Sequence, residues 1–348
     1  MSTQTFSDVS PVFVVGAPRS GTTMVQRMLD AHPRLAIFDE VTYFEGILKM
    51  TGVVPDLAVP GAIDRFFEAL PRLEQYPYWN NIDDLLVAVR AALEASDQPS
   101  YPLVYRTFME AYARRCGKAR FGDKSPANVR HLDATLAMFP KARIIHVVRD
   151  PRGAVASRRN TEWSSDEVLS TAAKWRLDVE AARRFAASAP AGVITEVRYE
   201  DMVRSTEKEL RRLCDFVGEP YDPAMLEFHR SSDVSFQASP WKDGVFRPVS
   251  EASLERWRKE LTEPQVGIIQ LVVGKALRQH GYETATLSLA TRLGLPLQLV
   301  REVRGWRAFK KEVAQRRRAA DNPIGSDAKP LSRMALRFVS EQLGLRQR

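Results

Sequence analysis

The sequence predicts an α/β fold in which helices cover both faces of a mainly parallel central sheet. Short apolar segments rich in β-branched residues recur, and each continues directly into a segment with helical periodicity; the clearest are residues 12–15, 143–148 and 192–198. Strands that alternate with helices along a chain pair in parallel. The 348 residues, 44% of them hydrophobic, suffice for one large domain and an appendage.

The first strand leads into a turn with the features of a phosphate-binding loop. Gly16 and Gly21 bracket this turn, and a helix is expected over residues 22–31. The amides that open a helix have no acceptor within it, so the turn offers N–H groups to an anion. The spacing is that of G-x-x-x-x-G-K-[ST], except that Thr22 stands at the lysine position and Arg19 supplies a cation earlier. This pattern predicts a P-loop-type three-layer αβα fold. The alternative is a glycine-rich turn that binds nothing. The residues expected to hold phosphate are Arg19, Ser20, Gly21, Thr22 and Thr23.

Two further strand ends carry charged side chains. A short strand over residues 35–38 ends at Glu40, and another ends near Lys124 before a helix expected over 127–139. Ligands of open α/β sheets lie at the carboxyl ends of the strands. We therefore expect Glu40 and Lys124 to face the same crevice as the phosphate loop. For Lys124, the local spacing alone allows a solvated loop lysine equally well.

A second strand-to-helix turn with anion-binding features follows residues 143–148. Arg149 stands at the end of this strand, and Ser157 lies further along the helix that follows. Two such turns in one sheet predict a ligand with two separate phosphate groups. Tyr199, at the end of the strand over 192–198, is placed to stack on a base. His146, within an apolar strand, is expected to be a core histidine.

The remaining segments suggest an insertion and an extension. Residues 43–116 have a mostly helical, aromatic-rich pattern and are expected to cover one face of the sheet. Residues 1–284 are assigned to the main domain, and residues 285–348 to a basic amphipathic extension with 14 Lys/Arg and 5 Asp/Glu, a balance of +9. The rest of the chain has a balance of −1. Such an extension suits peripheral contact with an anionic membrane or packing on the domain. Nucleic-acid binding is disfavoured, because no recognition module is visible.

Composition argues against a metal centre and for a reducing compartment. The only cysteines, Cys116 and Cys214, lack metal-ligand spacing, so two free thiols and no metal are expected. Residues 1–10 hold no basic residue, and the apolar run behind them is too short for a signal peptide or a membrane span. We expect a cytoplasmic protein, with any membrane contact on the inner surface.

Taken together, these motifs resemble those of the sulfotransferases that use 3′-phosphoadenosine 5′-phosphosulfate (PAPS) as donor. Residues 16–23 resemble their 5′-phosphosulfate loop, residues 144–157 their 3′-phosphate site, and residues 197–201 the later strand whose tyrosine meets the adenine. The resemblance covers about residues 11–282, with the three motifs in order. It implies binding of PAPS and release of 3′-phosphoadenosine 5′-phosphate, without a metal.

Within this family, the chain is most similar to the tyrosylprotein sulfotransferases and their bacterial relatives. By position, the resemblance implies that Glu40 is the base and that Lys124 contacts the transferred group. Small-molecule sulfotransferases use a histidine base, for which His131 is the outside candidate. Thr161 stands where the branch often has a donor-binding arginine, and Arg247 replaces a lysine of the closing segment.

The resulting hypothesis is in-line transfer of a sulfuryl group from PAPS to an acceptor hydroxyl. The acceptor could be a glycan, a lipid, a phenol or a peptide tyrosine, since each offers a hydroxyl. The main alternative is a P-loop nucleotide kinase or hydrolase, which would need magnesium. A nucleotide-binding protein without catalysis is the third hypothesis.

Overall fold

The computed structural model describes residues 9–319 except 74–75, 77–78, 160–167 and 231–246. Its centre is a parallel five-stranded sheet in the order β2-β3-β1-β4-β5. The strands are β1 (Val12–Gly16), β2 (Leu35–Asp39), β3 (Arg120–Lys124), β4 (Arg143–Val148) and β5 (Ile194–Arg198). The strand over 192–198 thus begins two residues later than expected, and the others agree closely with the sequence prediction.

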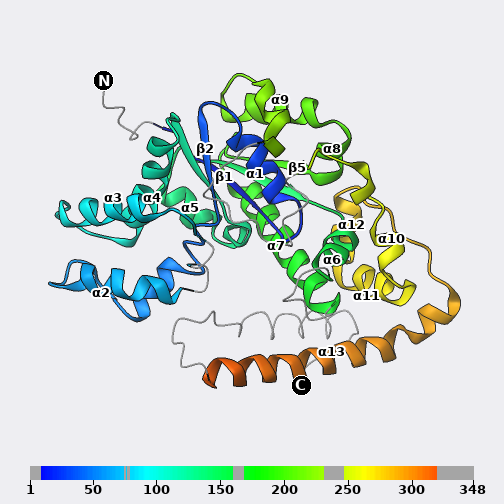
Figure 1. The fold of residues 1–348 in the computed structure, drawn as a ribbon. Helices are drawn as coiled ribbons and strands as arrows, with labels where there is room; N and C mark the ends of the chain where they lie inside the picture. Colours follow the sequence, from blue (N-terminus) through cyan, green and yellow to red (C-terminus); the bar gives the residue numbers. More distant parts are fainter. Residues whose placement is uncertain (1–8, 74–75, 77–78, 160–167, 231–246, 320–348) are drawn as a thin grey trace.

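Helices cover both faces of the sheet, which confirms the predicted three-layer α/β fold (Figure 1). Val12 and Val14 pack on one face against α1 (Thr22–Asp30) and α9 (Thr206–Val217). Phe13 and Val15 pack on the other face with α4 (Tyr101–Arg115), α5 (Leu132–Met138) and α7 (Val168–Ser188). Successive side chains of a strand point to opposite faces, so an entirely apolar β1 must be buried on both sides.

The helical insertion covers one face of the sheet, as expected. Of its helices, α4 packs directly on β2 and β3, and α3 packs on α4. Helix α2 lies below α3, at the lower left of Figure 1. The elements before α4 are η2 (Ile47–Gly52), α2 (Ala62–Ala69), η3 (Leu70–Arg72) and α3 (Asp83–Glu94).

Several segments expected as single helices are interrupted. The helix expected over 127–139 consists of η5 (Pro126–Arg130) and α5, because His131 leaves the helical region at φ −128° and ψ 27°. The sequence also predicts one helix over residues 265–279, which is broken at Gly274, where φ is +53°. The remaining elements are α6 (Pro151–Arg159), α8 (Tyr199–Arg204), η6 (Pro223–Arg230), η8 (Glu251–Ser253), α10 (Trp257–Glu260), α11 (Glu263–Val273) and α12 (Lys275–Gln279). The sequence further predicts a loop over residues 230–248 and a helix over residues 331–343; most of this loop and all of this helix lie outside the described residues.

The long helix α13 (Leu289–Ala319) packs on α11 and α7 and runs along the lower side of the molecule in Figure 1. Leu299 is buried, and Leu295 and Val303 contact the same apolar cluster. Gly267 of α11 makes room for this contact, because a Cβ there would lie 2.7 Å from Leu295 Cδ2. No helix in the described part of the chain is both long enough and apolar enough to span a bilayer. The division at residue 284 stays a prediction.

Candidate active site

The carboxyl ends of the five parallel strands meet at one edge of the sheet, and each carries a residue singled out by sequence. These are Arg19 after β1, Glu40 after β2, Lys124 at the end of β3, Arg149 after β4 and Tyr199 after β5. Five residues predicted from five separate strand ends therefore converge on the place where α/β sheets bind ligands.

The phosphate loop presents unpaired polar groups. Gly21 occupies the N-cap position of α1, where no side chain caps the helix, so the first-turn amides are available to an anion. Ser20 is fully buried, and its Oγ has no hydrogen-bond partner among the described residues. Gly21 has φ +92°, and a Cβ there would lie 2.3 Å from Tyr199 Cδ2. Only glycine therefore fits between this loop and the end of β5.

Two hydrogen bonds join the phosphate loop to the second predicted anion site. Arg19 has a left-handed backbone, with φ +71°, and its Nε donates to Ser157 Oγ at 3.2 Å. Arg149 Nη1 donates to the Arg19 carbonyl oxygen at 3.3 Å. The two turns, predicted separately from sequence, thus form one continuous site.

Arg149 also organises the side of the site that faces β5. Its guanidinium carbon lies 4.2 Å from the centre of the Tyr199 ring, and its Nη2 donates to the Ser253 carbonyl oxygen at 3.0 Å. The Tyr199 hydroxyl pairs with Ser253 Oγ at 2.8 Å. Arg149 thus lies over the ring of Tyr199, which is 9% exposed. Stacking of Tyr199 on a base stays a prediction.

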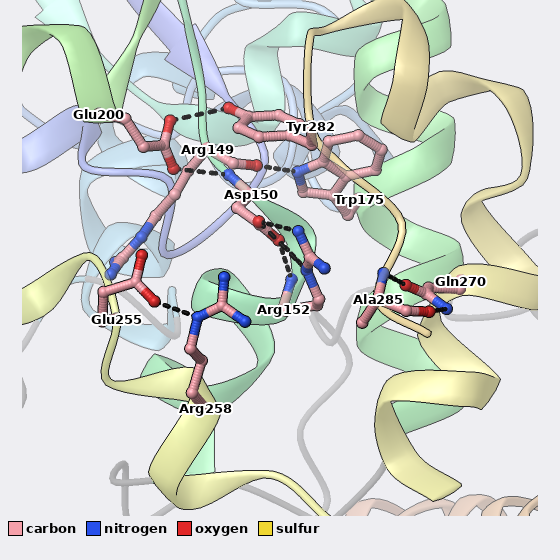
Figure 2. Close-up of polar contacts among 10 residues, drawn as sticks. All are labelled: Arg149, Asp150, Arg152, Trp175, Glu200, Glu255, Arg258, Gln270, Tyr282 and Ala285. Carbon is pink, nitrogen blue, oxygen red and sulfur yellow. Dashed lines mark hydrogen bonds and ion pairs between the residues drawn. The ribbon is translucent and has the colours of Figure 1, made fainter. Parts of the chain in front are cut away.

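Figure 2 shows the hydrogen bonds that hold the backbone of the turn after β4 in place. Trp175 Nε1 donates to the Arg149 carbonyl oxygen at 2.8 Å, and the Asp150 amide donates to Glu200 Oε1 at 3.0 Å. The Tyr282 hydroxyl donates to the other oxygen of Glu200 at 2.9 Å. Backbone held in this way orients the Arg149 side chain before any ligand arrives.

Positive charge gathers around Arg19. Burial lowers the pKa of Arg19 to about 10, and the positive charges of Arg149, Arg158 and Arg256 add to the effect, while the Glu40 carboxylate opposes it. Cations held this close together favour an anion between them. The residues present therefore fit a nucleotide that carries anionic groups at two positions.

The segment that carries Glu40 is strained and held in place. Glu40 and Thr42 have positive φ values of 65° and 48°. The Val41 amide donates to Asp123 Oδ1 at 3.0 Å, and the Thr42 amide donates to Ser125 Oγ at 3.0 Å. Each such backbone costs on the order of 1–3 kcal/mol and persists where the surroundings fix it, which is common at functional sites.

Asp123, which helps to fix this segment, lies in a buried polar network of its own. Its Oδ2 accepts hydrogen bonds from the Tyr105 hydroxyl at 2.8 Å and from Asn128 Nδ2 at 3.2 Å. Burial raises the pKa of Asp123 to about 6. The segment after β2 is therefore tied to α4 and η5 through one carboxylate.

Lys124 is fully buried, so the alternative of a solvated loop lysine is wrong. Its Nζ lies 2.5 Å from Glu40 Oε1 and also contacts Asp39 Oδ1. Burial alone would lower the pKa of Lys124, but the two carboxylates outweigh it and raise the pKa above its usual value. Lys124 is therefore a buried cation beside Glu40; its contact with a transferred group stays a prediction.

The two histidines weighed from sequence lie in different surroundings. The His131 ring stacks on Phe44, with ring centres 4.6 Å apart, and burial lowers its pKa. His146 is 1% exposed, and its Nδ1 pairs with Glu196 Oε2 at 3.0 Å. His146 is thus a core histidine, as expected.

The segment over residues 247–256 contributes two residues to the site that the sequence did not single out. Arg247 is exposed and makes no hydrogen bond or ion pair with the described residues, so its donor contact stays a prediction. Ser253 and Arg256 instead reach the site, as the contacts of Arg149 and the pKa of Arg19 show. Thr161 lies outside the described residues, whereas Arg158 lies close enough to Arg19 to affect its pKa.

Within the described ranges, no three His, Cys, Asp or Glu side chains group closely enough to hold a metal ion. The expectation that the reaction needs no metal stays a prediction.

Comparison with known proteins identifies the family. The model of the sulfotransferase family matches residues 11–223. The chain is 25% identical to protein-tyrosine sulfotransferase A of Caenorhabditis elegans, over 80% of this chain and 69% of that protein. It is 27% identical to protein-tyrosine sulfotransferase 1 of Danio rerio, over 72% of this chain and 66% of that protein. It is also 27% identical to nodulation protein NoeE of Sinorhizobium fredii, over 79% of this chain and 68% of that protein. The chain thus spans about two thirds of the length of these relatives.

Solved structures support the fold. The sulfotransferase domain from the curacin biosynthetic pathway matches with a TM-score of 0.56 and 20% identity, over 80% of this chain and 99% of that domain. The sulfotransferase domain of the Synechococcus PCC 7002 olefin synthase matches with a TM-score of 0.55 and 20% identity, over 82% of this chain and 100% of that domain. With the family model matching more than half of the chain, the resemblance seen in the motifs is confirmed: the protein belongs to the sulfotransferase family and is a sulfotransferase enzyme.

Proposed function

We propose that the enzyme transfers the sulfuryl group of PAPS to an acceptor hydroxyl by in-line displacement, with Glu40 as the base. The observation that carries this proposal is the joined anion site, in which Arg19 bonds to Ser157 and Arg149 bonds to Arg19. A donor with a 5′-phosphosulfate and a 3′-phosphate would satisfy both halves of this site. A nucleoside triphosphate would leave the second half without a partner.

The proposed roles follow from the placement of the charged groups. Glu40, whose side chain is 38% exposed, would take the proton of the acceptor hydroxyl as that oxygen attacks sulfur. Arg19 and the amides of Gly21–Thr23 would stabilise the charge that develops on the leaving 5′-phosphate. Such preorganised electrostatic stabilisation is commonly the largest contribution to catalysis. Arg149 and Ser157 would hold the 3′-phosphate.

Transfer of labelled sulfate tests the proposal. The enzyme is incubated with PAPS labelled in its sulfate and with an extract of its source cells, with and without a chelator. We expect label in one acceptor fraction in both samples. Cleavage of ATP that stops when the chelator is added, without label transfer, would instead favour the kinase or hydrolase. Binding of 3′-phosphoadenosine 5′-phosphate without any turnover would favour a binding protein.

The labelled fraction would also identify the acceptor class. Several relatives are named protein-tyrosine sulfotransferases, so a peptide tyrosine is the first acceptor to test. Glycan, lipid and phenol hydroxyls remain the other proposed acceptors. The cytoplasmic location stays a prediction.

We further propose peripheral contact with an anionic membrane through α13. Leu289, Leu293, Leu297 and Val300 are 72%, 75%, 61% and 45% exposed, and their spacing places them along one side of the helix. A different side of α13 packs on α11. Exposed leucines at this spacing, within an extension of balance +9, suit an anionic lipid surface.

Sedimentation with lipid vesicles tests this contact. Replacing Leu289, Leu293 and Leu297 together with Gln should reduce binding to phosphatidylglycerol vesicles on the order of tenfold or more, because apolar area no longer leaves water. Val87→Gln, at a position of α3 that is 69% exposed, is the matched control and should bind as wild type does. Unchanged binding of the triple variant, or equal binding of wild type to neutral phosphatidylcholine vesicles, would contradict the proposal.

A further inference from the structure

The ion pair between Lys124 and Asp39 is built into the sheet. Asp39 and Lys124 are register partners on the neighbouring strands β2 and β3. The Lys124 side chain is 0% exposed, that of Asp39 is 9% exposed and that of Glu40 is 38% exposed. One buried ammonium is therefore shared between a carboxylate on the core side and a carboxylate that reaches the solvent-facing site.

The other charged groups around this trio come from neighbouring elements. Arg19 lies close enough to Glu40 for the negative charge of Glu40 to raise the pKa of Arg19. Asp123, the residue before Lys124 on β3, bonds to Tyr105 and Asn128 instead. The positive charge of Lys124 also acts on Asp123, but successive residues of a strand point to opposite faces, so Asp123 does not replace Asp39 as the ion-pair partner of Lys124. Arg149, Arg158 and Arg256 affect Arg19.

The pairing of Lys124 with two carboxylates matters when Glu40 takes up a proton. Before transfer, Asp39, Glu40 and Lys124 together have a charge of −1. When Glu40 is protonated, Asp39 still neutralises Lys124. If Asp39 had no charge, the same protonation would leave Lys124 as a buried cation without an ion-pair partner, and burying an unpaired charge is strongly unfavourable. Glu40 would then hold its negative charge more tightly and be a weaker base.

We infer that Asp39 is a positioning residue for sulfuryl transfer, because it neutralises the buried ammonium of Lys124 and so leaves Glu40 able to accept the acceptor proton. The inference rests on the proposed role of Glu40. In the transfer, the hydroxyl proton moves to Glu40 and the acceptor oxygen bonds to sulfur. The bond between sulfur and the 5′-phosphate oxygen breaks, and its electron pair leaves with that oxygen. Glu40 later returns the proton to water.

The pH dependence of kcat tests this inference. In Asp39→Asn, Glu40 is the sole carboxylate that forms an ion pair with Lys124, and this pairing favours the charged form of Glu40. We expect the acid limb of the profile to move to lower pH by about one unit, and the plateau rate to fall on the order of tenfold because the base is weaker. A merely structural role would reduce the amount of active enzyme without moving the limb.

Two further variants keep the test decisive. Lys124→Met removes the shared cation, so the acid limb should move to higher pH, opposite to the shift in Asp39→Asn; this arm stands even where Asp39→Asn does not fold. Asp84→Asn is the matched control, since Asp84 is a surface carboxylate of α3 paired with Arg115, and its limb should stay in place. The role of Asp39 would be overturned if the acid limb of the kcat profile stayed in place or moved to higher pH in Asp39→Asn. It would also be overturned if the limb stayed in place or moved to lower pH in Lys124→Met.

Failure of the proposed function would look different. Unaltered turnover of Glu40→Gln would exclude Glu40 as the base. Wild-type enzyme that transfers no label from PAPS would exclude the proposed sulfuryl transfer. An unmoved limb in enzyme that passes both tests overturns only the inference about Asp39.

Discussion

Replacing Glu40 with Gln or Ala should reduce sulfuryl transfer on the order of a hundredfold or more, while binding of 3′-phosphoadenosine 5′-phosphate stays as in wild type. The reason is that either variant removes the group proposed to take the acceptor proton and leaves the arginines of the donor site in place. Gln preserves the shape of the side chain, and Asp39 still pairs with Lys124 in both variants. Single-turnover rates with bound PAPS, together with calorimetric titration of the nucleotide product, would measure the two effects separately.

The control for this prediction is Glu68→Gln, which neutralises an exposed carboxylate of α2 and should turn over at the wild-type rate. Turnover of Glu40→Gln within about twofold of wild type would show that another group accepts the proton. His131 would then be the next residue to replace, since it is the outside candidate from sequence.

Replacing Arg149 with Ala should weaken binding of 3′-phosphoadenosine 5′-phosphate on the order of tenfold to a hundredfold. Hydrogen bonds to charged groups contribute about 1.5–3 kcal/mol each, which corresponds to this range. Adenosine 5′-phosphosulfate lacks the 3′-phosphate, so wild type and the variant should bind it with similar affinity. Titration of both nucleotides against both proteins would therefore assign Arg149 to one end of the donor.

Arg211→Ala is the matched control, because Arg211 also lies over a tyrosine ring, with its guanidinium carbon 4.1 Å from the centre of Tyr221, and pairs with Glu207. This variant should bind both nucleotides as wild type does. An equal loss of affinity for the two nucleotides in Arg149→Ala would mean that Arg149 supports the whole site through Tyr199 and Ser253 rather than holding the 3′-phosphate.

Local patterns were enough to predict the fold class and most of the residues that meet at the candidate site. The strand ends at Glu40 and Arg149 could be predicted because each apolar run stops abruptly at charged residues, and parallel strands end at one edge. The phosphate loop could be predicted from its glycine spacing, since Gly21 must adopt a positive φ beside Tyr199.

What the sequence could not show depends on contacts between distant segments. Lys124 lies in a polar stretch, and its burial follows from the pairing of β2 with β3 rather than from its neighbours in the chain. Ser253 reaches Arg149 from 104 positions away, and no local motif marks it. The break at His131 accompanies stacking of its ring on Phe44, which comes from the insertion. A short interruption of this kind leaves little trace in helical periodicity.

The position of β1 in the sheet has a consequence for synthesis of the protein. β1 lies between β3 and β4, and its partners Gly122 and Arg143 are more than a hundred positions further along the chain. This wholly apolar strand therefore leaves the ribosome before either of its neighbours has been translated. Pairing between distant strands is slow, and unpaired apolar strands are prone to aggregate. The phosphate loop that follows β1 is thus translated before β3 and β4, yet it takes its final shape only after these strands on both sides of β1 have been translated.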